Sequence, residues 1–146
     1  MIVVLDYDDI YQVWQKYLWP DRKSDITQTS AMSFLGGYDS DNMSYAPTFF
    51  GYVENGVLLG VNSGHKCVDN SYRSRGLYVF PEARKKGIGS KLLIATIEQG
   101  KLASAKFVWS YPKQTSWTVY QKAGFNLSSP WEISELGLNA YCIKQL

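Results

Sequence analysis

The sequence predicts an α/β protein whose strands are mostly antiparallel, and three patterns carry this prediction. Two runs rich in β-branched and aromatic residues, 48–53 and 57–62, flank an Asn-Gly pair that suits a tight hairpin turn. A further extended run covers residues 72–80. Apolar residues then recur at helical spacing over residues 88–97 and form one apolar face. Strands joined by a tight turn and followed by an amphipathic helix indicate a sheet with helices packed on it.

A short strand and two helices are expected before the hairpin. Residues 2–5 are apolar and form the strand, and Asp6 is a suitable N-cap for an amphipathic helix over residues 7–19. Pro20 ends that helix. A second helix is predicted over residues 26–35, because a glycine pair follows it and suits a helix C-terminus.

The segments around and after the amphipathic helix complete the layout. Residues 37–47 are rich in Gly, Asp, Ser and Asn and are expected to form an exposed loop. The amphipathic helix is expected to end close to Gly100. Residues 105–111 are predicted as a strand, residues 115–122 as a helix and residues 141–146 as the last strand. The sheet is therefore expected to be flanked by about four helices.

Composition indicates one domain over residues 1–146. The chain is 45% hydrophobic, 15% aromatic and 19% charged, which is enough apolar material for one packed core. It carries 15 Lys and Arg against 13 Asp and Glu, a formal net charge of +2. A near-neutral balance argues against charge-driven binding to nucleic acid.

Neither a membrane span nor a secretion signal is predicted. The apolar runs fall well short of the roughly 18 residues that cross a bilayer, and residues 1–6 lack a basic start followed by a long apolar stretch. We therefore expect a cytoplasmic protein. Cys67 and Cys142 belong to no Cys-x-x-Cys pair, so we expect reduced thiols and no metal site.

The segment after residue 80 has the composition of an anion site. Gly87 and Gly89 remove side chains where the chain enters a helix, so several N–H groups can converge on a pyrophosphate. Arg84, Lys85 and Lys86 add positive charge beside it. The spacing fits neither a P-loop nor a dinucleotide fingerprint, which requires a third glycine or alanine. On these residues alone, a basic helix entry that binds nothing is the alternative.

Two motifs together resemble the GNAT superfamily of N-acyltransferases. The family's acyl-CoA motif, Gln/Arg-x-x-Gly-x-Gly/Ala after a strand written roughly Leu-x-Val-x-Pro, matches Leu77-Tyr78-Val79-Phe80-Pro81 and Arg84-Lys85-Lys86-Gly87-Ile88-Gly89. A second motif, a Tyr followed by a Lys, a Gly and an aromatic, matches Tyr120-Gln121-Lys122-Ala123-Gly124-Phe125. The motifs occur in the family's order, and the resemblance covers almost the whole chain.

This resemblance implies a mixed, mostly antiparallel sheet that is splayed in the middle and holds acyl-CoA in the wedge. The backbone of Leu77, Tyr78 and Val79 would pair with the pantetheine arm. The pyrophosphate would be held by the amides of Lys85, Lys86, Gly87, Ile88, Gly89 and Ser90. By the same resemblance, Tyr120 donates a proton to the departing CoA thiolate.

The chain departs from the family pattern at two points. Lys113 stands where many members carry an Asn that contacts the cofactor. No carboxylate occupies the strand over residues 71–77, where many members place a Glu that acts as the general base. Val108 stands at the position where ribosomal-protein acetyltransferases carry their base. The remaining base candidates are a water chain, Asp69, Glu54 and His65. Glu82 is interpreted as a solvated turn residue.

Residues for the amine acceptor are expected in the first two helices, in the loop over residues 37–47 and around residues 65–75. Carboxylates in the loop would attract a cationic amine and nearby aromatics would form a wall; these are Asp39, Asp41, Tyr38, Tyr45 and Phe49. Alternatively, the carboxylates solvate the loop and the aromatics belong to the core. Arg73 and Arg75 favour an acceptor with a carboxylate or phosphate, or they form a solvent-facing edge.

The sequence thus predicts an N-acetyltransferase that moves an acetyl group from acetyl-CoA to a primary amine, on a small molecule or a peptide, by direct attack in a ternary complex. No metal, membrane or nucleic-acid partner is expected, and the chain is expected to be a monomer or homodimer. Two rivals remain open. One is a non-catalytic, CoA-binding or regulatory module of the same fold, and the other is a small RNA-binding protein that uses Arg84, Lys85 and Lys86.

Overall fold

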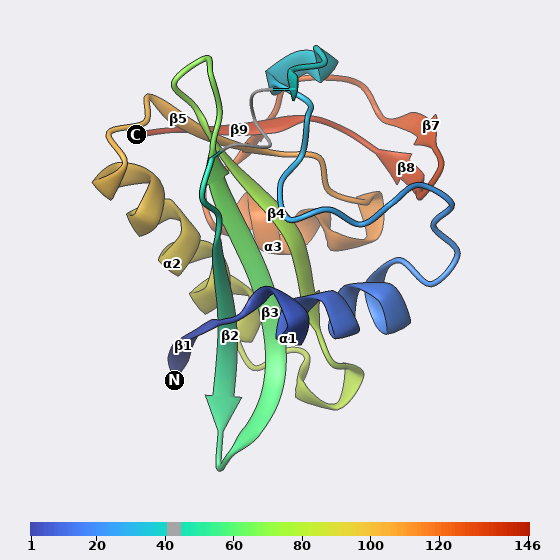
Figure 1. Ribbon diagram of the computed structural model, residues 1–146, viewed down its shortest axis with the longest axis vertical. Helices are drawn as coiled ribbons and strands as arrows, with labels where there is room; N and C mark the ends of the chain where they lie inside the picture. The colour runs from blue at the N-terminus through green and yellow to red at the C-terminus, as the bar shows by residue number, and fades with distance from the viewer. Residues whose placement is uncertain (41–44) are drawn as a thin grey trace.

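The computed structural model describes residues 1–40 and 45–146, in which a seven-stranded sheet has the strand order β1-β2-β3-β4-β5-β9-β6 (Figure 1). All neighbours pair antiparallel except β4 and β5, which are parallel. The strands are β1 (Ile2–Leu5), β2 (Thr48–Glu54), β3 (Val57–Lys66), β4 (Tyr72–Val79), β5 (Phe107–Ser110), β9 (Cys142–Gln145) and β6 (Asn126–Leu127). A separate hairpin consists of β7 (Glu132–Ser134) and β8 (Gly137–Asn139). The predicted mixed, mostly antiparallel sheet is confirmed.

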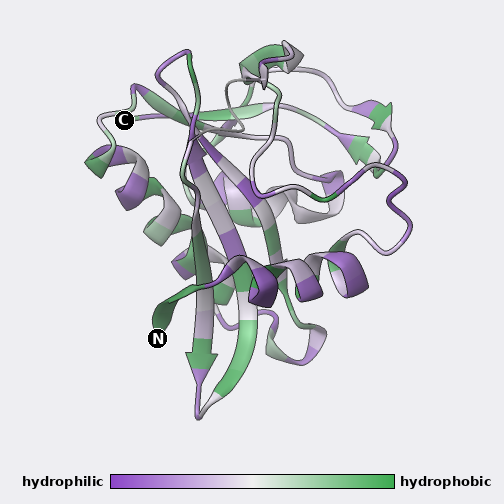
Figure 2. Ribbon diagram, viewed as in Figure 1, coloured by the Kyte–Doolittle hydropathy of each residue, from purple (hydrophilic) through white to green (hydrophobic). Residues whose placement is uncertain are grey.

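Helices cover both faces of the sheet. Neighbouring residues of a strand point to opposite faces, so they pack against different helices. Phe49 packs against α1 (Tyr7–Val13) and the π-helix η1 (Trp14–Leu18) that continues it. The next residue, Phe50, packs on the other face against α2 (Ile88–Leu102). Figure 2 shows hydrophilic residues on the outer turns of the first helix and on the segment that follows it.

The described residues form three α-helices, α1, α2 and α3 (Trp117–Lys122), rather than the four expected. The predicted helix over residues 26–35 is wrong, and only the short 3-10 turn η2 (Phe34–Gly36) lies there. Backbone groups of the segment over residues 26–35 bond instead to distant side chains. Ile26 accepts from the Tyr7 hydroxyl at 2.6 Å, and the Ser30 N–H donates to His65 at 3.2 Å. These tertiary bonds replace the i to i−4 bonds of a helix.

Two further boundaries differ from expectation. The strand β3 continues beyond the predicted run over residues 57–62 to Lys66, so His65 lies in a strand. The helix α2 continues past Gly100 to Leu102. A Cβ at Gly100 would lie 3.2 Å from atoms of both Tyr72 and Val108, so this glycine lets α2 approach the sheet closely.

A bulge interrupts β4 at Gly76. The register with β3 shifts between Val61 and Ser63, and Gly76 has φ +79°, a conformation that favours glycine. The Trp14 indole N–H donates to the Gly76 carbonyl at 2.8 Å. A Cβ at this position would lie 2.3 Å from the indole ring. The bulge and the first helix therefore fix each other's position.

The sheet splits between β4 and β5. Their only pairs are Tyr72 with Val108 and Arg73 with Trp109. The Ser110 hydroxyl donates to the Ser74 carbonyl at 2.7 Å, just beyond these pairs. From there to Val79, no described strand pairs with β4 on that side. The expected splayed sheet is confirmed, and it leaves a wedge beside the second half of β4.

In the part of the chain that the structure describes, no helix is both long and apolar enough to cross a membrane.

Candidate functional site

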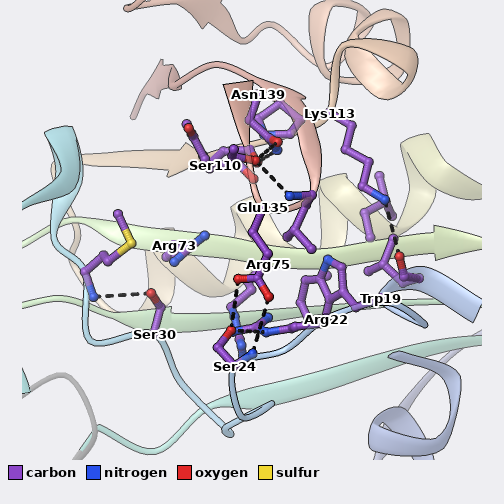
Figure 3. A pocket seen from close by; sticks show the side chains of 18 of the residues that line it. Trp19, Arg22, Ser24, Ser30, Arg73, Arg75, Ser110, Lys113, Glu135 and Asn139 are labelled. Carbon is purple, nitrogen blue, oxygen red and sulfur yellow. Dashed lines mark hydrogen bonds between the residues drawn. The ribbon is translucent and has the colours of Figure 1, made fainter. Parts of the chain in front are cut away.

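A cavity of about 510 Å³ opens where β4 and β5 diverge. Arg73, Arg75 and Leu77 line it from β4, and Ser110 and Tyr120 line it from the other side of the split. The irregular segment between the first helix and β2 forms the opposite wall, together with the hairpin β7–β8; its lining residues include Trp19, Arg22, Thr27, Thr29, Ser30, Ser134, Glu135 and Asn139. Figure 3 shows Ser30, Trp19 and both strand arginines around this space.

Tyr120 lies on α3 and is only 3% exposed. Its ring packs edge-on against Phe125 with centroids 5.5 Å apart. Burial raises the pKa of the phenol above its usual value, while interactions with the Ser110 and Ser74 hydroxyls and the charge of Arg73 oppose that shift. The phenol is therefore protonated at neutral pH and can donate a proton into the cavity.

The turn after β4 presents exposed cations beside a helix N-terminus. Arg84, Lys85 and Lys86 are exposed, and the Arg84 Nε donates to the Val79 carbonyl at 2.8 Å. Lys85 and Gly87 have φ +63° and +79°, and α2 begins directly after Gly87. The first amides of a helix lack hydrogen-bond partners within the helix, so the N–H groups of residues 88–90 can donate to a bound anion.

Gly89 brings this turn close to α3. A Cβ at Gly89 would lie 3.1 Å from Val119, the residue before Tyr120. The helix start that carries the predicted anion site therefore packs against the helix that carries the predicted acid. The end of β4 also lies beside this helix start, since a Cβ at Gly89 would lie 3.7 Å from Val79, and Leu77 of the same strand lines the cavity.

His65 is placed in a way that prevents it from acting as a base. It is fully buried, its Nε2 accepts the Ser30 N–H at 3.2 Å, and its Nδ1 lies 3.2 Å from the Lys66 carbonyl. Burial, reinforced by Arg73, lowers the pKa of His65 to about 3. A neutral imidazole with both nitrogens engaged holds the cavity wall at Ser30 and takes up no proton near neutral pH.

The two carboxylate candidates for the base do not line the cavity. Asp69 lies in the turn before β4 and accepts from the Ser71 N–H at 3.2 Å and the Ser71 hydroxyl at 2.5 Å. Glu54 is the last residue of β2, at the tip of the first hairpin. Of the described residues, the one carboxylate in the lining is Glu135, which the sequence analysis did not single out.

Glu135 is engaged at the rim of the cavity. Its carboxylate accepts from the Lys23 N–H at 2.6 Å and from the Ser24 N–H and hydroxyl at 3.3 Å. These hydrogen bonds lower the pKa of Glu135, which weakens it as a base. Nothing local in its sequence marks Glu135, since its partners precede it by more than 100 residues.

Lys113 lies at the mouth of the cavity and contacts the protein rather than standing free. Its Nζ donates to the Leu18 carbonyl at 3.3 Å, and partial burial lowers its pKa. Lys113 thereby links the segment after β5 to the end of η1.

The residues expected to bind the acceptor amine do not lie together in one site. Tyr38 lines the cavity, whereas Tyr45 lines a separate surface hollow beside Tyr7 and Tyr11. Phe49 is 7% exposed and packs in the core, as the alternative interpretation had it. Asp39 does not line the cavity, and Asp41 lies outside the described residues.

Arg73 and Arg75 form the most distinctive part of the lining. Arg75 is 4% exposed, its guanidinium lies 5.0 Å and 5.2 Å from the ring centroids of Trp14 and Trp19, and it donates to the Thr27 carbonyl at 2.7 Å. Arg73 lies 4.6 Å over the ring of Trp109. These positions exclude the solvent-facing edge that the sequence left open.

No group of three or more His, Cys, Asp or Glu that could hold a metal occurs within residues 1–40 and 45–146. Both cysteines are buried free thiols, as expected.

Comparison with known families agrees with this geometry. A family model described as the Acetyltransferase (GNAT) family matches residues 6–125, which is well over half of the chain. The chain belongs to the GNAT acetyltransferase family. The match includes the turn after β4 and ends at Phe125, so it covers both motifs identified in the sequence. No curated protein matches the chain significantly.

Solved structures share the fold of this GNAT protein over its whole length. An acetyltransferase from Bacillus subtilis in complex with CoA has 17% identity and a TM-score of 0.69, covering 99% of this chain and 97% of that one. A GNAT acetyltransferase from Staphylococcus aureus Mu50 has 14% identity, a TM-score of 0.70 and coverage of 99% and 98%. The IAA acetyltransferase from Bacillus cereus has 16% identity, a TM-score of 0.68 and coverage of 100% and 99%. At such identities these similarities establish the fold alone.

Proposed function

We propose that the protein is an N-acetyltransferase that moves an acetyl group from acetyl-CoA to a primary amine by direct attack in a ternary complex. The observation that carries this proposal is the arrangement around the split in the sheet. An unpaired length of β4, a basic helix-entry turn and a buried tyrosine surround one wedge that opens into a cavity.

Acetyl-CoA occupies the wedge in this proposal. The pantetheine arm extends along the free side of β4 at Leu77, Tyr78 and Val79, in the way an added strand pairs with a sheet edge. The pyrophosphate lies on the amides of residues 85–90, with Arg84, Lys85 and Lys86 around it. The CoA bound to the Bacillus subtilis structure of the same fold supports the choice of cofactor.

The reaction begins when the neutral amine nitrogen attacks the thioester carbonyl carbon. A C–N bond forms and the carbonyl electrons move to oxygen. The attacking nitrogen, now positively charged, loses a proton to ordered water, and the tetrahedral intermediate collapses with cleavage of the C–S bond. Tyr120 donates its phenolic proton to the departing thiolate and is later reprotonated from solvent. Alignment of amine and thioester lowers the barrier by several kcal/mol, because a bimolecular step becomes intramolecular in effect.

The proton on the amine leaves through ordered water or is already absent when the amine binds. His65 is neutral and engaged, and Glu135 is held by three donors, so neither serves as the base. This shortage of free carboxylates among the described residues of the cavity is what favours the rival function, a CoA-binding module without turnover.

The test has two measurements on the purified protein. Calorimetry with acetyl-CoA and CoA measures binding, for which we expect micromolar-range affinity. Release of CoA thiol is then measured over a panel of primary amines, and mass spectrometry confirms the acetylated product. Binding of CoA with no turnover on any amine would favour the non-catalytic module, and no binding by the folded protein would overturn the assignment. A titration with single- and double-stranded RNA tests the remaining rival.

A further inference from the structure

Two adjacent cationic side chains reach into the cavity from the same face of β4. Arg73 and Arg75 are two residues apart, so their side chains lie on one side of the strand (Figure 3). Ser74 between them points to the other face, where its hydroxyl accepts from Asn62 at 2.9 Å. Arg75 is 4% exposed, and Arg73 is only partly exposed. Both guanidinium groups are thus largely withdrawn from bulk water.

These charges lack an anionic partner among the described residues. No Asp or Glu oxygen described here lies within 4.0 Å of either guanidinium. Glu135, the carboxylate of the lining, is engaged by Lys23 and Ser24 at the rim. The Arg73 Nε is buried and finds no hydrogen-bond acceptor within residues 1–40 and 45–146. Arginine stays protonated in proteins, so the cavity holds two buried positive charges.

Contacts with aromatic rings offset only part of this charge. Trp14, Trp19 and Trp109 lie against the two guanidinium groups, and such contacts attract a cation only moderately. The cost of burying an ion without a counterion is larger. An arrangement of this kind is suited to a ligand that brings a negative charge.

We propose that Arg73 and Arg75 bind a carboxylate or a phosphate carried by the acetyl-accepting amine. This proposal rests on the acetyl-transfer function proposed above and specifies its substrate class, an amine with an anionic group such as an amino acid or a phosphorylated amino alcohol. Leu77 and Tyr120 line the same cavity, so an anion bound by the arginines places its amine near the acyl group. A volume of about 510 Å³ accommodates such a molecule.

The phosphates of CoA do not serve as this anion. Arg73 and Arg75 precede Phe80 by seven and five residues along β4, with the bulge at Gly76 between them and Phe80. At roughly 3.3 Å per residue, and less across the bulge, they stand up to about 16–23 Å before the turn that would bind the pyrophosphate. The two basic sites therefore lie well apart along the same strand, one for the cofactor and one for the acceptor.

The first test measures binding and needs no turnover. Calorimetry in saturating CoA compares N-acetyl-amino acids with the matching N-acetyl-amino acid amides, which are the products of anionic and neutral acceptors. A second arm compares N-acetyl-O-phosphoethanolamine with N-acetylethanolamine. We expect at least one anionic member to bind at least tenfold tighter than its neutral partner, and the arm in which this occurs identifies carboxylate or phosphate. Equal binding in every pair would overturn the proposal.

Variants then test which residues cause the preference for anionic over neutral ligands. Arg75→Gln and Arg73→Gln are expected to reduce the anion preference to less than threefold. Lys101→Gln is the control, because it removes a positive charge from an exposed side chain of α2 that pairs with Glu98 at 3.1 Å and does not line the cavity; it should keep the preference. A preference that survives in both strand variants would overturn the assignment. Should Arg75→Gln fail to fold, the wild-type ligand pairs and Arg73→Gln still decide.

The outcomes separate the two proposals. Acetylation of neutral and anionic amines with equal kcat/KM would overturn the anionic acceptor and leave the acetyltransferase standing. Tight binding of anionic products without acetylation of any amine would overturn the proposed function and support the arginine site.

Discussion

The two walls of the cavity are built in different ways. On the cofactor side, β4, its turn and α2 follow one another along the chain, and β4 pairs with its neighbour β3 over most of its length. On the acceptor side, residues 19–40 form no α-helix or paired strand of the sheet. Side chains from Tyr7, His65 and Arg75 hold that segment, by bonds that span 19 to 48 residues.

This difference decides which features the sequence could predict. Strand and helix patterns are local, so the positions of β4, α2 and α3 agreed with expectation to within a few residues. The acceptor wall depends on partners that are distant in the sequence, and the chain there has no periodicity of its own. Its predicted helix was therefore wrong, and the engagement of Glu135 and the burial of Arg75 were visible only in three dimensions.

The largest expected effect lies where the two walls meet, at Tyr120. Tyr120→Phe removes the proton donor, and we expect turnover to fall roughly ten- to a thousandfold while CoA affinity changes little. Steady-state kinetics with an identified amine and calorimetry with CoA measure the two quantities. Tyr111→Phe is the matched control in the same cavity, because the Tyr111 hydroxyl donates to Glu132 at 2.8 Å at the exposed side. An unchanged rate in Tyr120→Phe would mean that water protonates the thiolate.

A second prediction concerns the cofactor side alone. Gly89→Val places a branched side chain where even an added Cβ would lie 3.1 Å from Val119, and it crowds the helix-start amides. We expect CoA affinity to fall at least tenfold, which corresponds to about 1.4 kcal/mol. Gly56→Ala serves as the control, since it also alters a glycine, with φ +76°, but at the distant hairpin tip. If Gly89→Val binds CoA as well as the parent, the turn is not the pyrophosphate site.

The site residues divide in the same way as the fold. Of the candidates from the cofactor motifs, Leu77 and Tyr120 line the cavity, and the others lie at the end of β4 and on the turn and helix start that follow it. The candidates for the acceptor and the base came from residue type alone, and Phe49, Asp69 and Glu54 turned out to lie elsewhere. A motif fixes the order of several residues and the helices or strands on which they lie, so it predicts their places in the fold. The type of a single residue, a carboxylate or an aromatic ring, does not predict where its side chain lies.

A third prediction tests how the acceptor wall is held. Because burial lowers the pKa of His65 from its usual 6.5 to about 3, the unfolded state binds more protons than the folded state between those values. Stability that His65 provides is therefore complete above about pH 6.5 and decreases as the pH falls. Integration of this linkage gives a loss of about 2 kcal/mol between pH 7 and pH 5.

Urea unfolding of the wild type and His65→Gln at pH 7, 6 and 5 measures this loss. A glutamine amide oxygen can still accept the Ser30 N–H but does not titrate, so its free energy of unfolding should change much less over this range. Parallel pH dependence in both proteins would show that the folded protein does not hold His65 in its neutral form.

The smallest expected effect concerns the base. Asp69→Asn and Glu54→Gln should change turnover by less than about twofold, because neither side chain lines the cavity. The pH profile of turnover over CoA is measured for two accepted amines whose pKa values differ by more than one unit. When water or prior ionisation removes the proton, the inflection follows the pKa of each amine. An inflection that stays fixed for both amines and disappears in one of these variants, or in His65→Gln, would instead identify a protein base. A protein side chain, rather than water, would then take the proton from the amine.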